Sequence, residues 1–439
     1  MKHIHRSAYL AVIFLLPFWS HVTIVRGDNT AIYYLYDSVA LFAMDGAVFL
    51  TIACWVLDCL TNERPLPNLF TPKAPMLPLA ALVGASLFSI PGSPTPWVSL
   101  SFALHLLLLV GLVTYTIHEA PSYSRVVAAL AIGIILQGIA VASQIATQTT
   151  YPVGTTMGWE HELPASQPGA SVVETVDGMR WLRAYGTFPH PNILAGYASA
   201  ALFPLAAFFL AARRPWAGWL LALPFLAFLV AALTFSRAGV IAMLAGLAVW
   251  GALLLGSQRP LHRRFFWLLG GFVALEAILV FALGPLVQVR LLDQSAPLEG
   301  RSTAERTLLY DHAYRLIVQH PLLGVGAGAY VVAQTGLDVD YNPPEPVHNV
   351  FLLVLSETGL MGGLAWLALW LGIMHATWRR RRHLDVWTAA WCASLAALFV
   401  VSLLDHYLWS LAPGRVLLWI MLGLWATALA RIEPCKSGS

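Results

Sequence analysis

The chain contains a series of apolar segments that are long enough to cross a lipid bilayer. A transmembrane helix needs roughly 20 apolar residues, and polar or charged connections separate segments of about this length along the whole sequence. We therefore predict an all-α polytopic membrane protein with about twelve transmembrane helices. The predicted spans are about 8–25, 36–58, 75–92, 97–117, 123–145, 191–212, 216–235, 237–256, 264–287, 350–376, 387–405 and 411–430.

The composition supports this fold class. Of the 439 residues, 58% are hydrophobic and only 11% are charged, and the mean hydropathy is +0.70. A soluble domain cannot bury so much apolar surface, so the bilayer must be the solvent for most of the chain. The four cysteines have no spacing typical of a zinc site or a disulfide framework, which predicts packing roles for them.

Two polar connections are much longer than the others. Loop A runs from about Thr147 to His190 and loop B from about Val289 to His348; connections of this length are usually functional or disordered. These loops divide the chain into helices 1–5 (1–146), loop A (147–190), helices 6–9 (191–288), loop B (289–348), and helices 10–12 with a short tail (349–439).

Loop B has the pattern of an ordered element. Residues 302–305 (Ser-Thr-Ala-Glu) form a capping-box pattern, which predicts a helix from about Thr303 to Gln319 that Pro321 stops. One face of this amphipathic helix is apolar, so we expect it to lie against the membrane domain. That face is formed by Leu309, Ala313, Leu316 and Ile317.

The basic residues indicate the orientation in the membrane. With the N-terminus in the cytoplasm, sixteen of the 25 basic residues are cytoplasmic and nine periplasmic, and the run Arg379–Arg382 lies inside. Both termini are then cytoplasmic, loops A and B are periplasmic, and the apolar run near the N-terminus is an uncleaved first helix. The cytoplasmic loops are too short for a nucleotide-binding domain, and we expect neither nucleotide nor nucleic acid as a partner.

Periplasmic arginines require an explanation under the positive-inside rule. Arg237 follows Ser236, a plausible N-cap, at a helix start whose free N–H groups favour an anion; the alternative is an arginine that reaches lipid phosphate. Arg306 lies near the start of the predicted loop B helix, where the alternative is an ion pair with Glu305 or Asp311. All nine are Arg26, Arg180, Arg183, Arg237, Arg290, Arg301, Arg306, Arg315 and Arg415.

Two further sites lie where the long loops re-enter the membrane. Arg183 precedes a stretch that ends at His190 and Asn192, and it is either a ligand-binding residue or an ordinary loop charge. His348 and Asn349 begin the tenth span, where a histidine is often just an interfacial polar residue.

Glu357 follows inside the tenth span. An intramembrane carboxylate is a functional candidate, or alternatively a packing residue with its hydrogen bonds satisfied.

Other patterns in the sequence are weaker indications of a ligand site or a reaction. Residues 324–328 resemble a dinucleotide-binding loop but follow a helix and a proline, which predicts a simple turn. The histidines lack the spacing of a zinc motif, so no metal is expected. Asp405 and His406 could form a catalytic pair, although no nucleophile is identifiable beside them.

Taken in order, these segments resemble the O-antigen ligase and polymerase family. The matching segments are 183–192, Thr-Phe-Ser-Arg-Ala-Gly at 234–239, 305–306 and 320–326, and His348-Asn349 followed after nine residues by Gly359 and Gly362. The resemblance covers roughly residues 180–380. It implies the membrane glycosyltransferase C-type architecture with a large, partly helical periplasmic loop.

The resemblance also implies a reaction. An O-antigen ligase transfers glycan from undecaprenyl pyrophosphate to a hydroxyl of the lipid A–core oligosaccharide at the periplasmic face of the inner membrane, without a cofactor. We expect His348 to be the general base of an inverting transfer and Arg237 and Arg306 to grip the pyrophosphate. The implied substrate-binding residues are Arg183, His190, Asn192, Ser236, Asn349 and Glu357.

Three alternatives remain at this point. An O-antigen polymerase uses the same donor with a second lipid-linked glycan as acceptor, and a protein O-oligosaccharyltransferase transfers the glycan to a protein. A transporter would have charges near the membrane midplane and an internal repeat, whereas the charges here cluster at one face.

Overall fold

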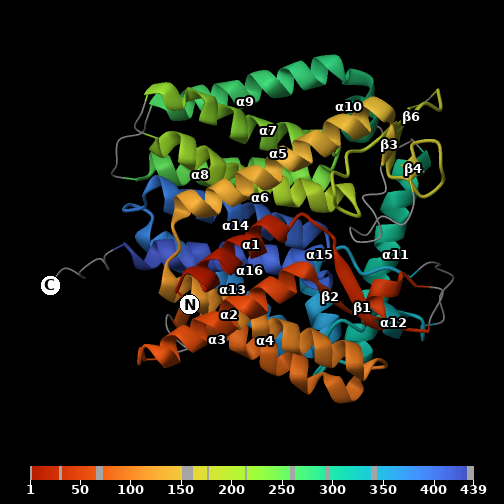
Figure 1. Ribbon diagram of the computed structural model, residues 1–439. Helices are drawn as coiled ribbons and strands as arrows, with labels where there is room; N and C mark the ends of the chain where they lie inside the picture. Colours follow the sequence, from red (N-terminus) through yellow and green to blue (C-terminus); the bar gives the residue numbers. More distant parts are fainter. Residues whose placement is uncertain are drawn as a thin grey trace.

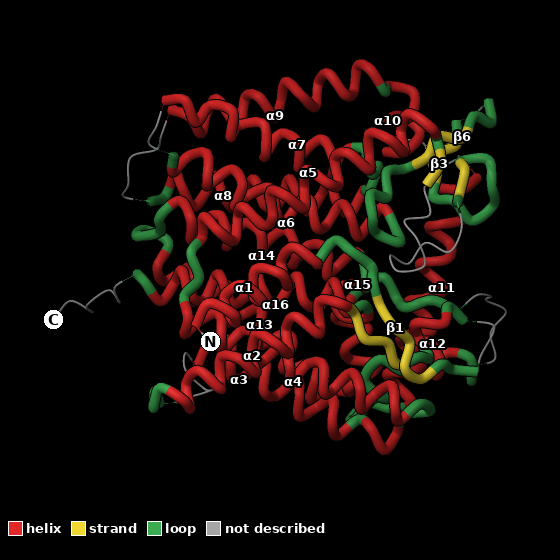
Figure 2. The backbone as a smooth tube through the Cα atoms, in the orientation of Figure 1, coloured by secondary structure: helices red, strands yellow, loops and turns green. Residues whose placement is uncertain are grey.

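The protein is a bundle of long helices with small strands and short helices at one end (Figure 1). The computed structural model of the chain describes residues 2–28, 32–65, 73–150, 162–175, 177–212, 215–257, 263–291, 297–337 and 344–432. The strands and the described parts of loops A and B gather at the same end, whereas α1 begins and α16 ends at the other (Figure 2). Both long loops therefore lie on one side of the helical bundle.

Ten of the described helices are long and apolar enough to cross a membrane. This confirms a polytopic, essentially all-α membrane protein. The ten are α2 (Ala43–Thr61), α3 (Lys73–Phe88, whose span continues through η2, Ile90–Gly92), α4 (Pro96–Glu119), α5 (Tyr123–Thr147), α6 (Pro191–Ala211), α8 (Arg237–Leu255), α9 (Arg263–Ala282), α13 (Val350–Arg380), α14 (Val386–Leu404) and α16 (Ala412–Ala430).

The other two predicted spans are shorter than expected. Helix α1 (Lys2–Leu15) ends two residues before Pro17, which cannot continue a helix, and the chain then enters strand β1 (His21–Val25). Helix α7 (Ala222–Ala232) follows the 3₁₀ helix η4 (Pro215–Leu221), and together they form a short apolar helix from Gly218 to Ala232. The predicted spans 8–25 and 216–235 are therefore wrong in their bounds.

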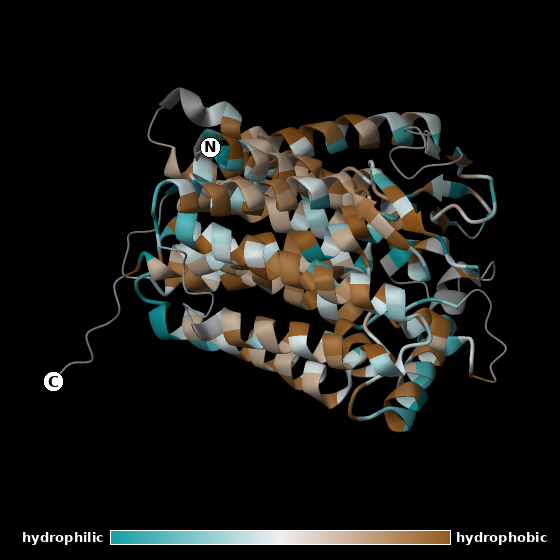
Figure 3. Ribbon diagram, turned by 60° about the horizontal axis from the view of Figure 1, so that its bottom comes forward, coloured by the Kyte–Doolittle hydropathy of each residue, from teal (hydrophilic) through white to brown (hydrophobic). Residues whose placement is uncertain are grey.

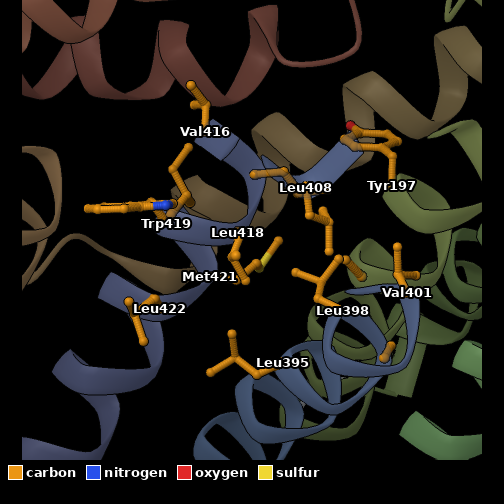
Figure 4. Packing of buried hydrophobic residues seen from close by; sticks show 14 of the residues in the cluster. Tyr197, Leu395, Leu398, Val401, Leu408, Val416, Leu418, Trp419, Met421 and Leu422 are labelled. Carbon is orange, nitrogen blue, oxygen red and sulfur yellow. The ribbon is translucent and has the colours of Figure 1, made fainter. Parts of the chain in front are cut away.

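The apolar helices differ in how deeply they lie in the bundle. The span of α16 is 100% buried inside the protein and that of α6 is 94% buried, whereas only 17% of α9 is buried. Helices α6, α14 and α16 pack through Tyr197, Leu398 and Met421, among others (Figure 4). Hydrophilic residues gather in the connections at the two ends of the bundle (Figure 3). Helices α6, α14 and α16 thus form the interior, and α9 is exposed to lipid.

Loop A contains short antiparallel hairpins that the sequence pattern did not predict. Strand β3 (Thr149–Thr150) pairs with β4 (Leu163–Pro164), and β5 (Val172–Glu174) pairs with β6 (Arg180–Leu182). A third hairpin, β1 with β2 (Val39–Phe42), follows α1. These strands of two to five residues are too short to show an alternating pattern.

Loop B is partly helical, as predicted, but its main helix is longer than expected. Helix α11 runs from Pro297 to Gln319, so Ser302–Glu305 lies inside the helix and the predicted capping box at its start is wrong. Proline is well suited to the first helical position, which explains the earlier start. Leu309, Ala313 and Leu316 are buried, which confirms the predicted apolar face. The remaining helices of this region are α10 (Gly284–Leu291) and α12 (Tyr330–Gln334).

Helix α13 is kinked at Gly359, where it meets the glycine-rich turn of loop B. Gly359 has a φ of +62° and a ψ of −164°, far from helical values. At this kink the backbone N–H groups of Val325 and Gly326 donate to the carbonyls of Ser356 and Glu357 (both 2.9 Å). Residues 324–328 are thus a turn, as predicted, and its hydrogen bonds hold loop B against α13.

We expect Gly359→Ala to destabilise this junction. A Cβ at Gly359 would lie 2.1 Å from the carbonyl oxygen of Leu322, and a left-handed backbone costs a non-glycine residue about 1–3 kcal/mol. Thermal unfolding in detergent should show a lower melting temperature. Gly372→Ala in the same helix is the control, because an added Cβ there has no neighbour within 4 Å among the described residues; equal melting temperatures would contradict the prediction.

Candidate active site

A cluster of histidines and one aspartate lies at the end of the bundle that carries the long loops. His348 precedes α13, Asp405 follows the last residue of α14, and His406 precedes the short helix α15 (Tyr407–Ser410). Ligand atoms of these three side chains lie within 4.8 Å of one another, and the rings of His348 and His406 are 5.1 Å apart. Asp405 and His406 had been noted in the sequence, but only the fold brings them to His348.

The carboxylate of Asp405 is the centre of this cluster. Its Oδ2 accepts a hydrogen bond from Asn192 Nδ2 (2.8 Å), and its Oδ1 accepts one from the backbone N–H of His406 (2.8 Å). His406 Nδ1 in turn contacts Ser410 Oγ (2.7 Å). Asp405 therefore ties the start of α6 to the end of α14 directly beside His348.

His190 and Asn349 hold the starts of the two helices that meet at the cluster. His190 Nδ1 accepts a hydrogen bond from the backbone N–H of Asn192 (3.1 Å), and its Nε2 lies 3.3 Å from Ser171 Oγ in loop A. Asn349 Oδ1 accepts from the N–H of Leu352 (3.1 Å) and its Nδ2 donates to the carbonyl of Leu403 (3.2 Å). Both predicted site residues are N-caps, which satisfy free helix-end N–H groups.

Arg183 connects loop A to the turn between α7 and α8. Its Nε donates to the carbonyl of Thr234 (2.8 Å) and its Nη2 donates to Asn192 Oδ1 (2.7 Å). Only 5% of the residue is exposed. The interpretation of Arg183 as an ordinary loop charge is therefore wrong, because the guanidinium links the 234–239 turn to Asn192 and, through Asn192, to Asp405.

Arg237 and Arg290 are joined by hydrogen bonds to the backbone at the start of α8. Ser236 Oγ accepts a hydrogen bond from the N–H of Gly239 (3.2 Å), which confirms the predicted N-cap. Arg237 Nε donates to the carbonyl of Arg290 (2.8 Å), and Arg290 Nε donates to the carbonyl of Phe235 (2.9 Å). Two guanidinium groups thus lie beside a helix N-terminus, an arrangement that favours an anion. Arg290 was counted among the periplasmic arginines but not selected.

Arg306 lies in α11, close enough to His348 for its positive charge to lower the pKa of this histidine. The side chain predicted as an alternative partner, Asp311, pairs instead with Arg315 (2.6 Å). Arg306 and the neighbouring Glu305 both affect the protonation of His348. Helix α11 therefore brings a cation close to the histidine cluster.

The pKa values of the three histidines and of Asp405 are all shifted downward. Burial lowers the pKa of His348; Asp405 opposes this shift and Arg306 adds to it. Burial also lowers the pKa of His406, to about 4, and burial together with Arg183 lowers that of His190. Burial alone would raise the pKa of Asp405, but the three histidines outweigh it and the net shift is downward.

His348 has one nitrogen that the fold does not use. Its ring is hydrogen-bonded to the backbone of Pro346, and its buried Nδ1 has no hydrogen-bond partner among the described residues. In a neutral imidazole one nitrogen carries the proton and the other a lone pair. Since Nδ1 has no partner among the described residues, it is available to meet a substrate hydroxyl.

Glu357 has its hydrogen bonds satisfied within the protein. It is 2% exposed, and its Oε2 accepts from the N–H of Gly328 (2.7 Å) and from Trp409 Nε1 (2.7 Å). These bonds join the glycine turn of loop B to α15. Glu357 thus has a packing role, and it also lines the cavity described next, so its substrate-binding role stays a prediction.

A cavity of about 670 Å³ lies close to the cluster. It begins beside Ser410, whose hydroxyl contacts His406, and its rim includes Phe49 and Trp97, whose side chains are 66% and 71% exposed. Its polar wall contains Arg415, whose Nε donates to His105 Nδ1 (2.9 Å). The cavity thus runs from exposed apolar side chains to Ser410, which contacts His406, although His348, Asp405 and His406 do not themselves line it.

The cluster also has side-chain nitrogen and oxygen atoms that could bind a divalent cation. Among the described residues, His348, Asp405 and His406 form the one group of this kind. Imidazole and carboxylate suit zinc and related metals, so the chemistry must be tested with and without a chelator.

Comparison with known proteins identifies the central part of the chain. Residues 222–367 match the model of the family described as O-antigen ligase. A search of curated proteins found no match. The matched segment contains the 234–239 turn, α11 with Arg306, and His348 with the kinked start of α13. This segment, which carries much of the cluster and its surroundings, is therefore similar to the O-antigen ligase family.

Proposed function

We propose that the protein is an O-antigen ligase that transfers glycan from undecaprenyl pyrophosphate to a hydroxyl of lipid A–core. The anomeric C–O bond of the donor breaks, a new bond forms to the acceptor oxygen, and undecaprenyl pyrophosphate leaves with the electron pair. The observation that carries the proposal is the neutral His348 beside Asp405, with Arg306 acting on the same histidine.

His348 is the general base in this proposal. The lone pair of its neutral ring takes the proton of the acceptor hydroxyl as the glycosyl bond forms, which gives direct inversion at the anomeric carbon. Asp405 lies beside it and stabilises the imidazolium that results. Asn192 positions Asp405 through their hydrogen bond (2.8 Å).

The arginines stabilise the leaving pyrophosphate, whose charge grows in the transition state. Arg306 approaches from α11, and Arg237 with Arg290 approaches from the N-terminus of α8. Fixed guanidinium groups stabilise such charge without a nucleotide. Arg183 assists by holding the 234–239 turn.

The cavity beside the cluster suits an amphiphilic substrate. Its rim of exposed aromatic side chains accommodates a lipid chain, and its inner end reaches Ser410 next to the histidines. A substrate held in the outer part of the membrane would therefore present its polar head to His348. We place this end of the bundle in the periplasm and the termini in the cytoplasm of the inner membrane, because the basic residues concentrate at the opposite end.

A purified transfer assay tests the proposal. We expect lipid A–core to gain glycan when protein in detergent is mixed with undecaprenyl-pyrophosphate-linked glycan, without an energy source and in the presence of a chelator. Loss of transfer on chelation that one divalent cation restores would instead assign His348, Asp405 and His406 to a metal. A lack of any covalent product, with movement of the donor across vesicles, would indicate a transporter.

A deletion strain separates the ligase from its relatives. Loss of a ligase leaves bare core while polymer accumulates on undecaprenyl pyrophosphate. Loss of a polymerase leaves a single repeat attached to core, and loss of a protein O-oligosaccharyltransferase leaves lipopolysaccharide intact. Gel analysis of lipopolysaccharide from the deletion strain distinguishes the three outcomes.

The transfer rate should depend on pH in a defined direction. A general base acts when it is neutral, and the pKa of His348 lies below its ordinary value of 6.5. We therefore expect kcat/KM to stay constant as the pH falls from 8 to about 6.5, the ordinary histidine pKa, and to decline only below it. A decline centred above pH 7 would contradict a neutral, buried His348.

A further inference from the structure

A second cavity, of about 540 Å³, lies at the end of the bundle opposite the histidine cluster. It is lined by the start of α1, the connection between α4 and α5, Trp387 near the start of α14, and Arg431 after α16. Helices α14 and α16, of 19 residues each, run from the cluster to this cavity, a length of about 28 Å at 1.5 Å per residue. The two cavities are therefore separate sites.

Basic side chains dominate the wall of this cavity. Arg6, Arg125 and Arg431 line it, against a single carboxylate, Glu119. Glu119 is already shared, because its Oε2 pairs with Arg6 Nη2 (3.1 Å) and its Oε1 accepts from Trp55 Nε1 (3.0 Å). Within the part of the chain that the structure describes, no ion pair joins Arg125 or Arg431 to a carboxylate. The side chains that line the cavity therefore carry a net positive charge.

Arg431 is held at the wall by groups that leave its charge unpaired. Its guanidinium lies over the ring of Tyr123, 4.6 Å from the ring centre, and its Nη2 donates to the carbonyl of Ala120 (3.3 Å). A carbonyl and an aromatic face fix the orientation of a guanidinium without neutralising it. The remaining N–H groups are left to meet a ligand.

Neutral hydrogen-bond donors complete the wall. Helix α5 begins at Tyr123, and its N-cap Ser122 makes no side-chain cap hydrogen bond. The hydroxyl of Tyr123 is buried with no hydrogen-bond partner among the described residues. Ser122 and Ser124 also line the cavity. Free N–H groups at a helix start and nearby hydroxyls are typical donors to a phosphate.

We propose that this cavity binds a phosphate-bearing anion, either the headgroup phosphate of an anionic phospholipid or a soluble phosphate compound. Its volume lies within the range of about 300–1,000 Å³ that is usual for ligand pockets. Arg125 and Arg431 supply the charge, and Tyr123 with the start of α5 supplies the hydrogen bonds. The site is independent of glycan transfer at the opposite end of the bundle.

Lipid and phosphate binding to the full-length protein tests the proposal. Native mass spectrometry measures retention of phosphatidylglycerol against phosphatidylcholine, and a thermal shift measures binding of inorganic phosphate. We expect the double variant Arg125→Gln/Arg431→Gln to bind about tenfold or more weakly than the natural protein, because each hydrogen bond to a charged group contributes about that much.

The control removes two charges from the same end of the bundle. Arg379 and Arg382 are exposed and do not line the cavity, so Arg379→Gln/Arg382→Gln should bind as the natural protein does. If the double variant in the cavity does not fold, Arg125→Gln alone provides the measurement, because this side chain is exposed.

The two sources of phosphate give different results. Preferential retention of phosphatidylglycerol assigns the cavity to a lipid headgroup, and stabilisation by inorganic phosphate without a lipid preference assigns it to a soluble compound. Equal binding by the cavity variants and the control pair, or no binding of either probe to the natural protein, would overturn the proposal.

Discussion

His348→Ala should reduce the rate of glycan transfer by about 10²–10⁴-fold, the usual contribution of a general base. The substitution removes the nitrogen that accepts the acceptor's proton, whereas Arg237, Arg306 and the cavity that hold the donor stay in place. We therefore expect kcat to fall while the dissociation constant of the lipid-linked donor changes little. Transfer rates with purified protein and donor binding measured separately provide the two quantities.

The histidine control lies at the same end of the bundle. His320 follows α11 and is exposed, so His320→Ala should leave transfer unchanged. Near-normal transfer by His348→Ala would refute the assignment of the base. A parallel loss of donor binding and transfer would instead give His348 a role in holding the substrate.

Arg306→Gln should reduce the transfer rate by about 10²–10³-fold, as the loss of one fixed donor to a developing negative charge does in other transfer enzymes. Arg306 also lowers the pKa of His348. Its removal should therefore raise that pKa and move the acidic limb of the pH–rate profile to higher pH. The rate at pH 8 and the position of this limb are independent readouts.

Arg315→Gln is the matched control for Arg306→Gln. Both arginines belong to α11, but Arg315 is paired with Asp311 and half exposed. A surface ion pair of this kind contributes little, so transfer by Arg315→Gln should be close to normal. Equal losses from the two variants would show that α11 acts through its overall charge, and the proposed contact with the pyrophosphate would be wrong.

The hydrophobic pattern was sufficient to predict the fold class and failed at particular helix ends. The spans α4, α5, α8 and α14 were placed within a few residues, because a long apolar run in a bilayer has no structure available other than a helix. The end of helix α1 was misplaced because the apolar run continues past Pro17 into β1. Apolar character alone does not distinguish a short helix from a strand. The start of α11 was misjudged because a capping-box sequence also occurs inside a helix.

The residues of the site were predicted in part. His348, Arg306 and Ser236 were recognisable because each stands at a helix end or in a segment predicted to be periplasmic, where the sequence itself reveals an unusual residue. Arg183 was identified, but not its link to Thr234 and Asn192, since those partners are 51 and 9 residues away in the chain.

The sequence alone predicts a polytopic helical membrane protein with two long polar loops, and it identifies histidines and arginines in unusual positions at the helix ends and in these loops. Which of these histidines and arginines lie in contact, and with which partners, is seen only in the tertiary structure. Asp405 reaches Asn192 across 213 residues, and His406 lies against His348, because α6, α13 and α14 end at the same level of the bundle. Such contacts depend on how helices pack side by side, and helix packing leaves no periodic pattern along the chain.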